Sequence, residues 1–126
     1  MPGPPSSSVR VFYPRRDRAA VVRTLRDGLP RLRASLPVCR VVLFGSYARG
    51  RHTVASDVDV LVVYRGEARS DAFALVKRAF DLPGLEPHPY SEREYSAVAR
   101  IIDRMTEGGV VLLDETEPAS GGPTTR

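Results

Sequence analysis

The sequence has one cysteine and lacks any long apolar run. Because Cys39 has no second cysteine to pair with, no disulfide can form within the chain, which favours a reducing, cytoplasmic location. No apolar stretch approaches the roughly 18 residues that a membrane-spanning helix needs. Residues 1–8 lack the apolar core of a signal peptide. We therefore expect a cytoplasmic protein without membrane association.

Aliphatic residues are also scarce at the two ends of the chain. Residues 1–8 are rich in proline, glycine and serine, and residues 115–126 contain alanine as their only aliphatic residue. Neither segment has enough apolar surface to offset the entropy lost on ordering, so both are expected to be disordered. The remaining residues, 9–114, have the length of one domain, and 42% hydrophobic residues in the chain are sufficient for one core.

Helical and strand patterns alternate within residues 9–114. Apolar residues recur at intervals of three and four between Val22 and Leu36, which predicts a helix. Pro30 falls inside this pattern and predicts either a kink or a second helix that begins there. Nearly continuous apolar runs at 38–44 and 58–64 predict two buried strands.

The same alternation continues in the second half of the domain. Ser70 is expected to open a helix that buries Phe73, Val76 and Phe80. Residues 85–90 are expected to form an edge strand, because the two prolines in this segment cannot donate to a strand ladder.

A capping box formed by Ser91 and Glu94 predicts the start of the last helix. The side chains that this helix is expected to bury are Tyr95, Val98, Ile102 and Met105. A short apolar run at 110–113 predicts the final strand. The order of elements indicates an α/β (α+β) fold with a mixed four-stranded sheet flanked by helices.

One segment has the composition of a chemical site. The predicted strand that ends at Phe44 is followed at once by Gly45 and Ser46. Glycine lets the backbone approach a ligand closely, and the serine hydroxyl can contact a phosphate. Asp57 and Asp59 open the next strand, and alternation along a strand directs both carboxylates to one face.

The two acids repel each other unless a cation compensates their charge. Magnesium that is bound by carboxylates and substrate phosphates supplies this compensation. Taken alone, Asp57-Val58-Asp59 is more typical of a solvated turn than of a metal site, and Gly45-Ser46 is more typical of a simple turn. Both motifs, each at a strand end and in this order, favour metal-assisted nucleotidyl transfer.

The combined pattern resembles the signature of the DNA polymerase β-like nucleotidyltransferase superfamily. Ten residues, 47–56, lie between Ser46 and Asp57, and Ala48-Arg49-Gly50 lies within this interval. This spacing is similar to that of the minimal nucleotidyltransferase (MNT) domains. The resemblance covers the chain from the helix near Leu25 to the strand at Leu113, and it implies the nucleotidyltransferase fold.

The resemblance also implies roles for individual residues. Gly45 and Ser46 would hold the triphosphate of ATP or another nucleoside triphosphate. Arg49 is a further candidate for phosphate contact from its place after Gly45-Ser46 alone, and a solvated arginine fits that place at least as well. Asp57 and Asp59 would bind two Mg²⁺ ions. The family uses a third carboxylate on a later strand, and Glu86 is the best candidate.

Two nearby residues are less informative. The prolines that follow Glu86 blur the register of its strand, so a surface acid is the alternative interpretation of this residue. His88 shares a strand face with Glu86 and could approach the metals, but the sequence favours a partly buried structural histidine.

The acceptor of the nucleotidyl group is expected to come from a partner. The net charge of +4 favours an anionic partner, but the chain has little room for a nucleic-acid groove and has no aromatic-rich basic strip, so direct nucleic-acid binding is not expected. MNT domains are often encoded beside HEPN proteins, and such antitoxins adenylylate a tyrosine of the HEPN ribonuclease. Two alternatives are nucleotidylation of a small molecule and a non-catalytic module that neutralises its partner by contact.

Overall fold

A computed structural model describes residues 17–50 and 57–115 of the chain. The N-terminal segment 1–8 and most of the C-terminal tail, for which disorder is expected from the sequence, lie outside the described residues. So do residues 51–56, between Arg49 and Asp57.

The first helix, α1 (Arg18–Ser35), is continuous. Asp17 caps its start by accepting a hydrogen bond from the backbone of Ala20 at 2.7 Å. Pro30 lies within the helix, so the expectation of a second helix beginning there is wrong. A proline removes one backbone hydrogen bond, and the burial of Leu25 and Leu32 on either side of it stabilises the helix across that gap.

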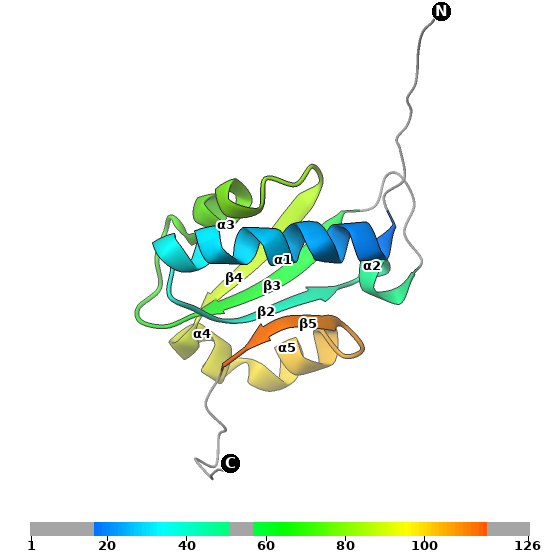
Figure 1. The fold of residues 1–126 in the computed structure, drawn as a ribbon. Helices are drawn as coiled ribbons and strands as arrows, with labels where there is room; N and C mark the ends of the chain where they lie inside the picture. The colour runs from blue at the N-terminus through cyan, green and yellow to red at the C-terminus, as the bar shows by residue number, and fades with distance from the viewer. Residues whose placement is uncertain (1–16, 51–56, 116–126) are drawn as a thin grey trace, which may run out of the picture.

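Within the described residues, four strands form one mixed sheet, as expected (Figure 1). They are β2 (Val38–Phe44), β3 (Val58–Tyr64), β4 (Leu85–Ser91) and β5 (Val110–Asp114), in the spatial order β4-β3-β2-β5. The middle strand β2 is antiparallel to both β3 and β5, whereas β3 and β4 are parallel. The edge position expected for residues 85–90 is confirmed.

Helices cover both faces of the sheet. On one face, α1 and α3 (Ala72–Phe80) pack on a large core, and Figure 1 shows α1 lying across the strands. On the other face, α4 (Glu92–Ala97) and α5 (Ala99–Met105) pack on a smaller core. A four-residue helix, α2 (Ser46–Arg49), follows β2 directly. We call the first the α1/α3 face and the second the α4/α5 face.

The helix after Ser91 differs from expectation. Its capping box is confirmed, because the Ser91 hydroxyl accepts from the Glu94 backbone and the Glu94 carboxylate accepts from the Ser91 backbone. A break at Val98 divides the helix into α4 and α5. Ile102 is fully buried, but Tyr95 and Val98 are only half-buried against the core. The break prevents one continuous stripe from facing the sheet.

The middle helix also differs in detail. It begins at Ala72 rather than Ser70 and buries Val76 and Phe80, but Phe73 is 43% exposed. Ala72 occupies the buried position that the sequence pattern assigned to Phe73. Among the described residues, no helix is both long enough and apolar enough to cross a membrane.

Candidate active site

The Gly45 turn connects β2 to α2 in a conformation that favours glycine. Its φ is +79°, and a Cβ placed on it would lie 2.5 Å from Oδ2 of Asp59. Tyr47 and Ala48 are buried and hold α2 against the core, whereas Ser46 is half-buried and Arg49 is exposed. The turn therefore brings the Gly45 backbone close to the Asp59 carboxylate, and Ser46 and Arg49 follow in α2.

The strand register brings two of the predicted acids together. Asp59 on β3 pairs with Glu86 on β4, and it pairs on its other side with Phe44 at the end of β2. Residues paired in this way lie side by side on one face of a sheet, here the α4/α5 face. The Asp59 side chain is 27% exposed and Glu86 is exposed, so both carboxylates remain accessible.

Asp57 lies one residue before the start of β3 and is exposed. Its carboxylate is therefore accessible at the same end of the strand as that of Asp59. Within residues 17–50 and 57–115, however, no group of three or more His, Cys, Asp or Glu side chains is arranged to hold a metal ion. The three-carboxylate ligand set stays a prediction.

The donor chemistry nevertheless fits magnesium. This cation prefers oxygen ligands, and it is commonly held by one or two carboxylates together with substrate phosphates and water. Asp59 and Glu86 supply carboxylate oxygens on one accessible face, and glycine at position 45 lets the turn approach Asp59 Oδ2 closely. Two protein carboxylates thus suffice for a metal that arrives with a triphosphate.

His88 contacts the site, a feature that the sequence left open. Its Nε2 lies 3.1 Å from Oδ1 of Asp59, and its ring packs edge-on against Phe44 with 5.0 Å between the ring centroids. The imidazole is thus held by an aromatic side chain on one strand while it holds a carboxylate on another. Alternation along β4 places His88 on the same face as Glu86, but only the register with β3 identifies Asp59 as its partner.

A second polar network, separate from the acids, lies on the α4/α5 face. Arg40 donates to the Tyr95 hydroxyl at 2.7 Å and contacts Asp103 at 3.2 Å, and Tyr95 donates to the same Asp103 carboxylate at 2.8 Å. Burial, followed by the hydrogen bond to Asp103, raises the pKa of the Tyr95 phenol above its usual range. This network joins β2 to α4 and α5 and has a structural role.

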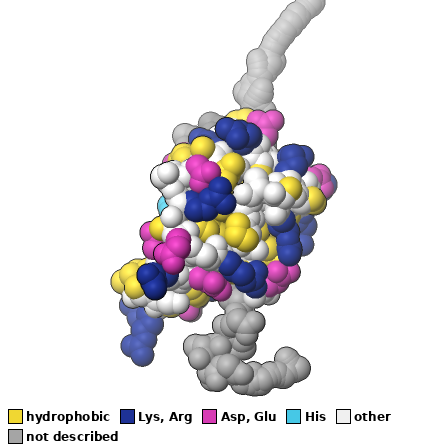
Figure 2. All heavy atoms as spheres, turned by 90° about the vertical axis from the view of Figure 1, so that its left-hand side faces the viewer, with side chains coloured by type: hydrophobic (Ala, Val, Ile, Leu, Met, Phe, Trp, Pro, Cys, Tyr) yellow, Lys and Arg dark blue, Asp and Glu magenta, His cyan; other side chains and the backbone are white. Residues whose placement is uncertain are grey.

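The described surface shown in Figure 2 carries charges of both signs, and the single cysteine is buried. Cationic and anionic side chains are interspersed over the described residues that Figure 2 shows, which form no broad basic patch on that side. Cys39 is fully buried, and burial raises the pKa of its thiol. The reactive thiolate is therefore disfavoured at this position.

Residues 22–109 match the family model of the nucleotidyltransferase domain. The chain belongs to this family. The nucleotidyltransferase match spans most of α1, the Gly45 turn and both strands that carry the acids. Family membership gives the activity class as transfer of a nucleotidyl group from a nucleoside triphosphate. The residues proposed from the sequence all lie in the matched range: Gly45, Ser46, Arg49, Asp57, Asp59 and Glu86.

Solved structures support the fold. A protein from Sulfolobus solfataricus, described as a candidate nucleotidyltransferase, is 21% identical with a TM-score of 0.53, over 75% of this chain and 80% of that one. Two toxin–antitoxin structures, a mutant of MntA–HpeT and a complex with AMP-PNP, are 19% and 21% identical. Their TM-scores are 0.45, over 79% of this chain and 74% of the other, too distant to support an inference about function. No curated protein shows significant similarity to the chain.

Proposed function

We propose that this nucleotidyltransferase uses ATP and magnesium to adenylylate a hydroxyl group of a partner protein. The observation that supports this most is the pairing of Asp59 with Glu86 on an accessible face of the sheet, beside the Gly45 turn. A cytoplasmic location belongs to the same proposal, and the single free thiol of Cys39 is compatible with it.

The acids form the metal-binding half of the proposed site. Asp57, Asp59 and Glu86 would hold two Mg²⁺ ions through carboxylate oxygens. When bound, Mg²⁺ neutralises charge on the triphosphate and favours deprotonation of the attacking hydroxyl. His88 holds one oxygen of Asp59 in place, so the second oxygen, Oδ2, keeps its orientation toward the Gly45 turn.

The turn and α2 form the phosphate-binding half. Gly45 presents its backbone without an obstructing side chain, and Ser46 offers a half-buried hydroxyl one residue later. Arg49 is exposed in the same short helix, where its guanidinium can reach a phosphate oxygen. Because Tyr47 and Ala48 anchor α2 in the core, these groups are fixed relative to Asp59.

The exposure of the acids favours a protein acceptor. A site that lies open on the surface can receive a side chain that projects from another protein, such as a tyrosine of a HEPN ribonuclease. The tyrosine oxygen would attack the α-phosphorus, the bond to the β-phosphate would break, and pyrophosphate would leave while AMP stays on the tyrosine. A neutral phenol has a pKa of about 10 and must lose its proton in this reaction.

A contact-only antitoxin is the second candidate. One observation favours it, namely that the described residues contain no group of three or more His, Cys, Asp or Glu side chains arranged for a metal. Such a protein would inhibit its partner by binding, without any change in the partner's mass.

Mass spectrometry of the protein co-expressed with the product of its neighbouring gene separates these candidates. Adenylylation predicts a mass increase of one adenylyl group, or of a small number of them, on a tyrosine of the partner. The Asp57→Asn variant should leave the partner unmodified. If the partner is inhibited without modification, and Asp57→Asn inhibits it equally well, the contact-only function is correct.

A further inference from the structure

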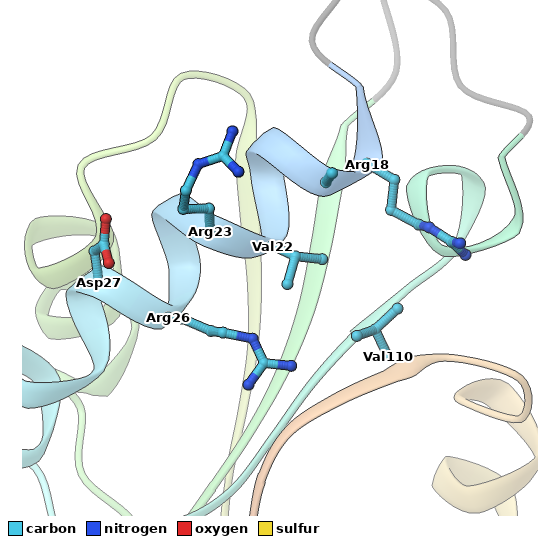
Figure 3. A pocket seen from close by; sticks show the side chains of 7 residues that line it. Arg18, Val22, Arg23, Arg26, Asp27 and Val110 are labelled. Carbon is cyan, nitrogen blue, oxygen red and sulfur yellow. The ribbon is translucent and has the colours of Figure 1, made fainter.

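A shallow groove lies between α1 and the start of β5, on the α1/α3 face and therefore on the opposite face from the acids (Figure 3). It has a volume of about 540 Å³. In Figure 3, Val22 and Val110 point toward each other at its centre, and Asp27 lies at the end away from Arg18. The side chains that decide its chemistry are Arg18, Val22, Arg23, Arg26, Asp27 and Val110.

The groove is strongly cationic. Three arginines are among the residues that line it, against the single acidic residue Asp27. In Figure 3 the Arg26 side chain extends toward the space between Val22 and Val110, whereas Arg23 points away from that space at the rim. Arg23 and Arg26 are exposed, and neither makes a hydrogen bond or an ion pair with another residue in the described part of the chain. The positive charges of Arg23 and Arg26 are therefore not neutralised within the described part of the chain, and both are available to an external anion.

The groove borders the Gly45 turn and α2 on the α1/α3 face. Arg18 donates to the carbonyl oxygen of Ala48 in α2 at 2.8 Å. Val110, at its other wall, pairs with Leu43 on β2, two residues before Gly45. A ligand held in the groove would therefore lie next to the turn that carries the proposed phosphate contacts.

We propose that this groove docks an acidic segment of a partner protein, one that carries an apolar side chain among its carboxylates. Two carboxylates can each accept paired hydrogen bonds from Arg23 and Arg26. An apolar side chain between them would cover the Val22 and Val110 surface. Two arginines without ion-pair partners beside an apolar surface of two valines match a peptide that carries both carboxylates and an apolar side chain.

Nucleic acid fits the same groove less well. No aromatic side chain is among the described residues that line it, so bases would have no stacking surface. The proposal names the docking chemistry of the partner in the proposed function, and it rests on that function only in taking the partner to be a protein.

Fluorescence anisotropy with the full chain tests this docking. The probe is a labelled peptide of four glutamates that flank two leucines, compared with its lysine-for-glutamate counterpart and with a labelled oligouridine RNA. The test variant is Arg23→Ala with Arg26→Ala. The matched control, Arg100→Ala with Arg104→Ala, removes two exposed arginines from α5.

The acidic peptide should bind the wild type, bind the groove variant about tenfold more weakly, and bind the control variant within about twofold of the wild type. Asp57→Asn should bind it as the wild type does, so that a failed transfer reaction and a failed docking site give different results. Absence of saturable peptide binding overturns the proposal, as does equal weakening in both arginine variants. Tighter binding of the RNA, lost in the groove variant, would also overturn it in favour of nucleic acid.

Discussion

The two faces of β3 show how one strand serves two purposes. On the α1/α3 face, Val58, Val60 and Val62 are all fully buried. On the α4/α5 face, Leu61 and Val63 are equally buried, but Asp59 at the start of the strand remains 27% exposed. Asp59 is therefore partly open to solvent, although Val58 and Val60 on either side of it in the strand are fully buried.

This difference separates stability from chemistry. The α1/α3 face is a closed core in which each side chain contributes by excluding water. On the α4/α5 face the core includes Phe44, but Asp59 and Glu86 at the adjoining strand positions remain accessible beside Gly45. Substitutions on the first face should reduce stability with little effect on the activity of folded molecules, and substitutions at the acidic end should do the reverse.

The largest expected effect is that of Asp59→Asn. Asparagine keeps the shape and the ability to accept from His88, but it removes the charge that the metals require. Adenylyl transfer from α-phosphate-labelled ATP to the partner should fall about 10²-fold or more, while the free energy of unfolding changes by less than about 0.5 kcal/mol. A variant that retains full transfer would remove Asp59 from the catalytic site.

Val60→Ala, at the next position, should give the opposite result. Val60 is fully buried on the α1/α3 face, so the loss of two methyl groups should reduce the free energy of unfolding by about 2–3 kcal/mol. Denaturant unfolding measures this change. Transfer per folded molecule should match the wild type, and a specific loss of transfer would show that the two faces are not independent.

Gly28→Ala should destabilise the contact between α1 and α3. A Cβ at Gly28 would lie 2.7 Å from a ring carbon of Phe80, which is fully buried and cannot move aside, so a loss of about 1–3 kcal/mol is expected. Pro30→Ala is the matched control, because it places alanine at an exposed position of the same helix and should raise stability. Thermal melts that moved in the same direction for both variants would contradict this account of helix packing.

The smallest expected effect is that of His88→Phe. Phenylalanine keeps a ring against Phe44 but removes the nitrogen that holds Asp59, so transfer at limiting magnesium should fall by roughly 2–10-fold. His88→Gln retains a donor and should recover part of the loss. If titration with magnesium gives the same half-saturation for His88→Phe and the wild type, His88 does not position Asp59.

The sequence predicted the order and type of the elements well where strong local signals exist. The runs 38–44 and 58–64 became β2 and β3, and the capping box at Ser91 starts α4. The errors lie where tertiary packing overrides local preference. Pro30 does not end α1, because the helix is held by buried leucines on both sides of it, and the break at Val98 has no proline or glycine to announce it.

For the candidate site, the sequence proposed residues but could not specify the contacts between them. The closeness of Gly45 to Asp59 and the pairing of Asp59 with Glu86 depend on strand order and register, which alternation along one strand does not specify. The hydrogen bond from His88 was missed for the same reason. Asp57 was proposed from the strand pattern and Arg49 from its place after Gly45-Ser46, and the structure adds that both are exposed.

Calorimetric titration of the protein with ATP is the most direct test of the central claim, that the acidic end of β3 and β4 is a metal–nucleotide site. ATP should bind in the presence of magnesium and bind much more weakly in EDTA, and the combined Asp57→Asn and Asp59→Asn variant should bind weakly in both conditions. Equal binding of ATP with magnesium and with EDTA, unchanged in that variant, would contradict the assignment of these acids.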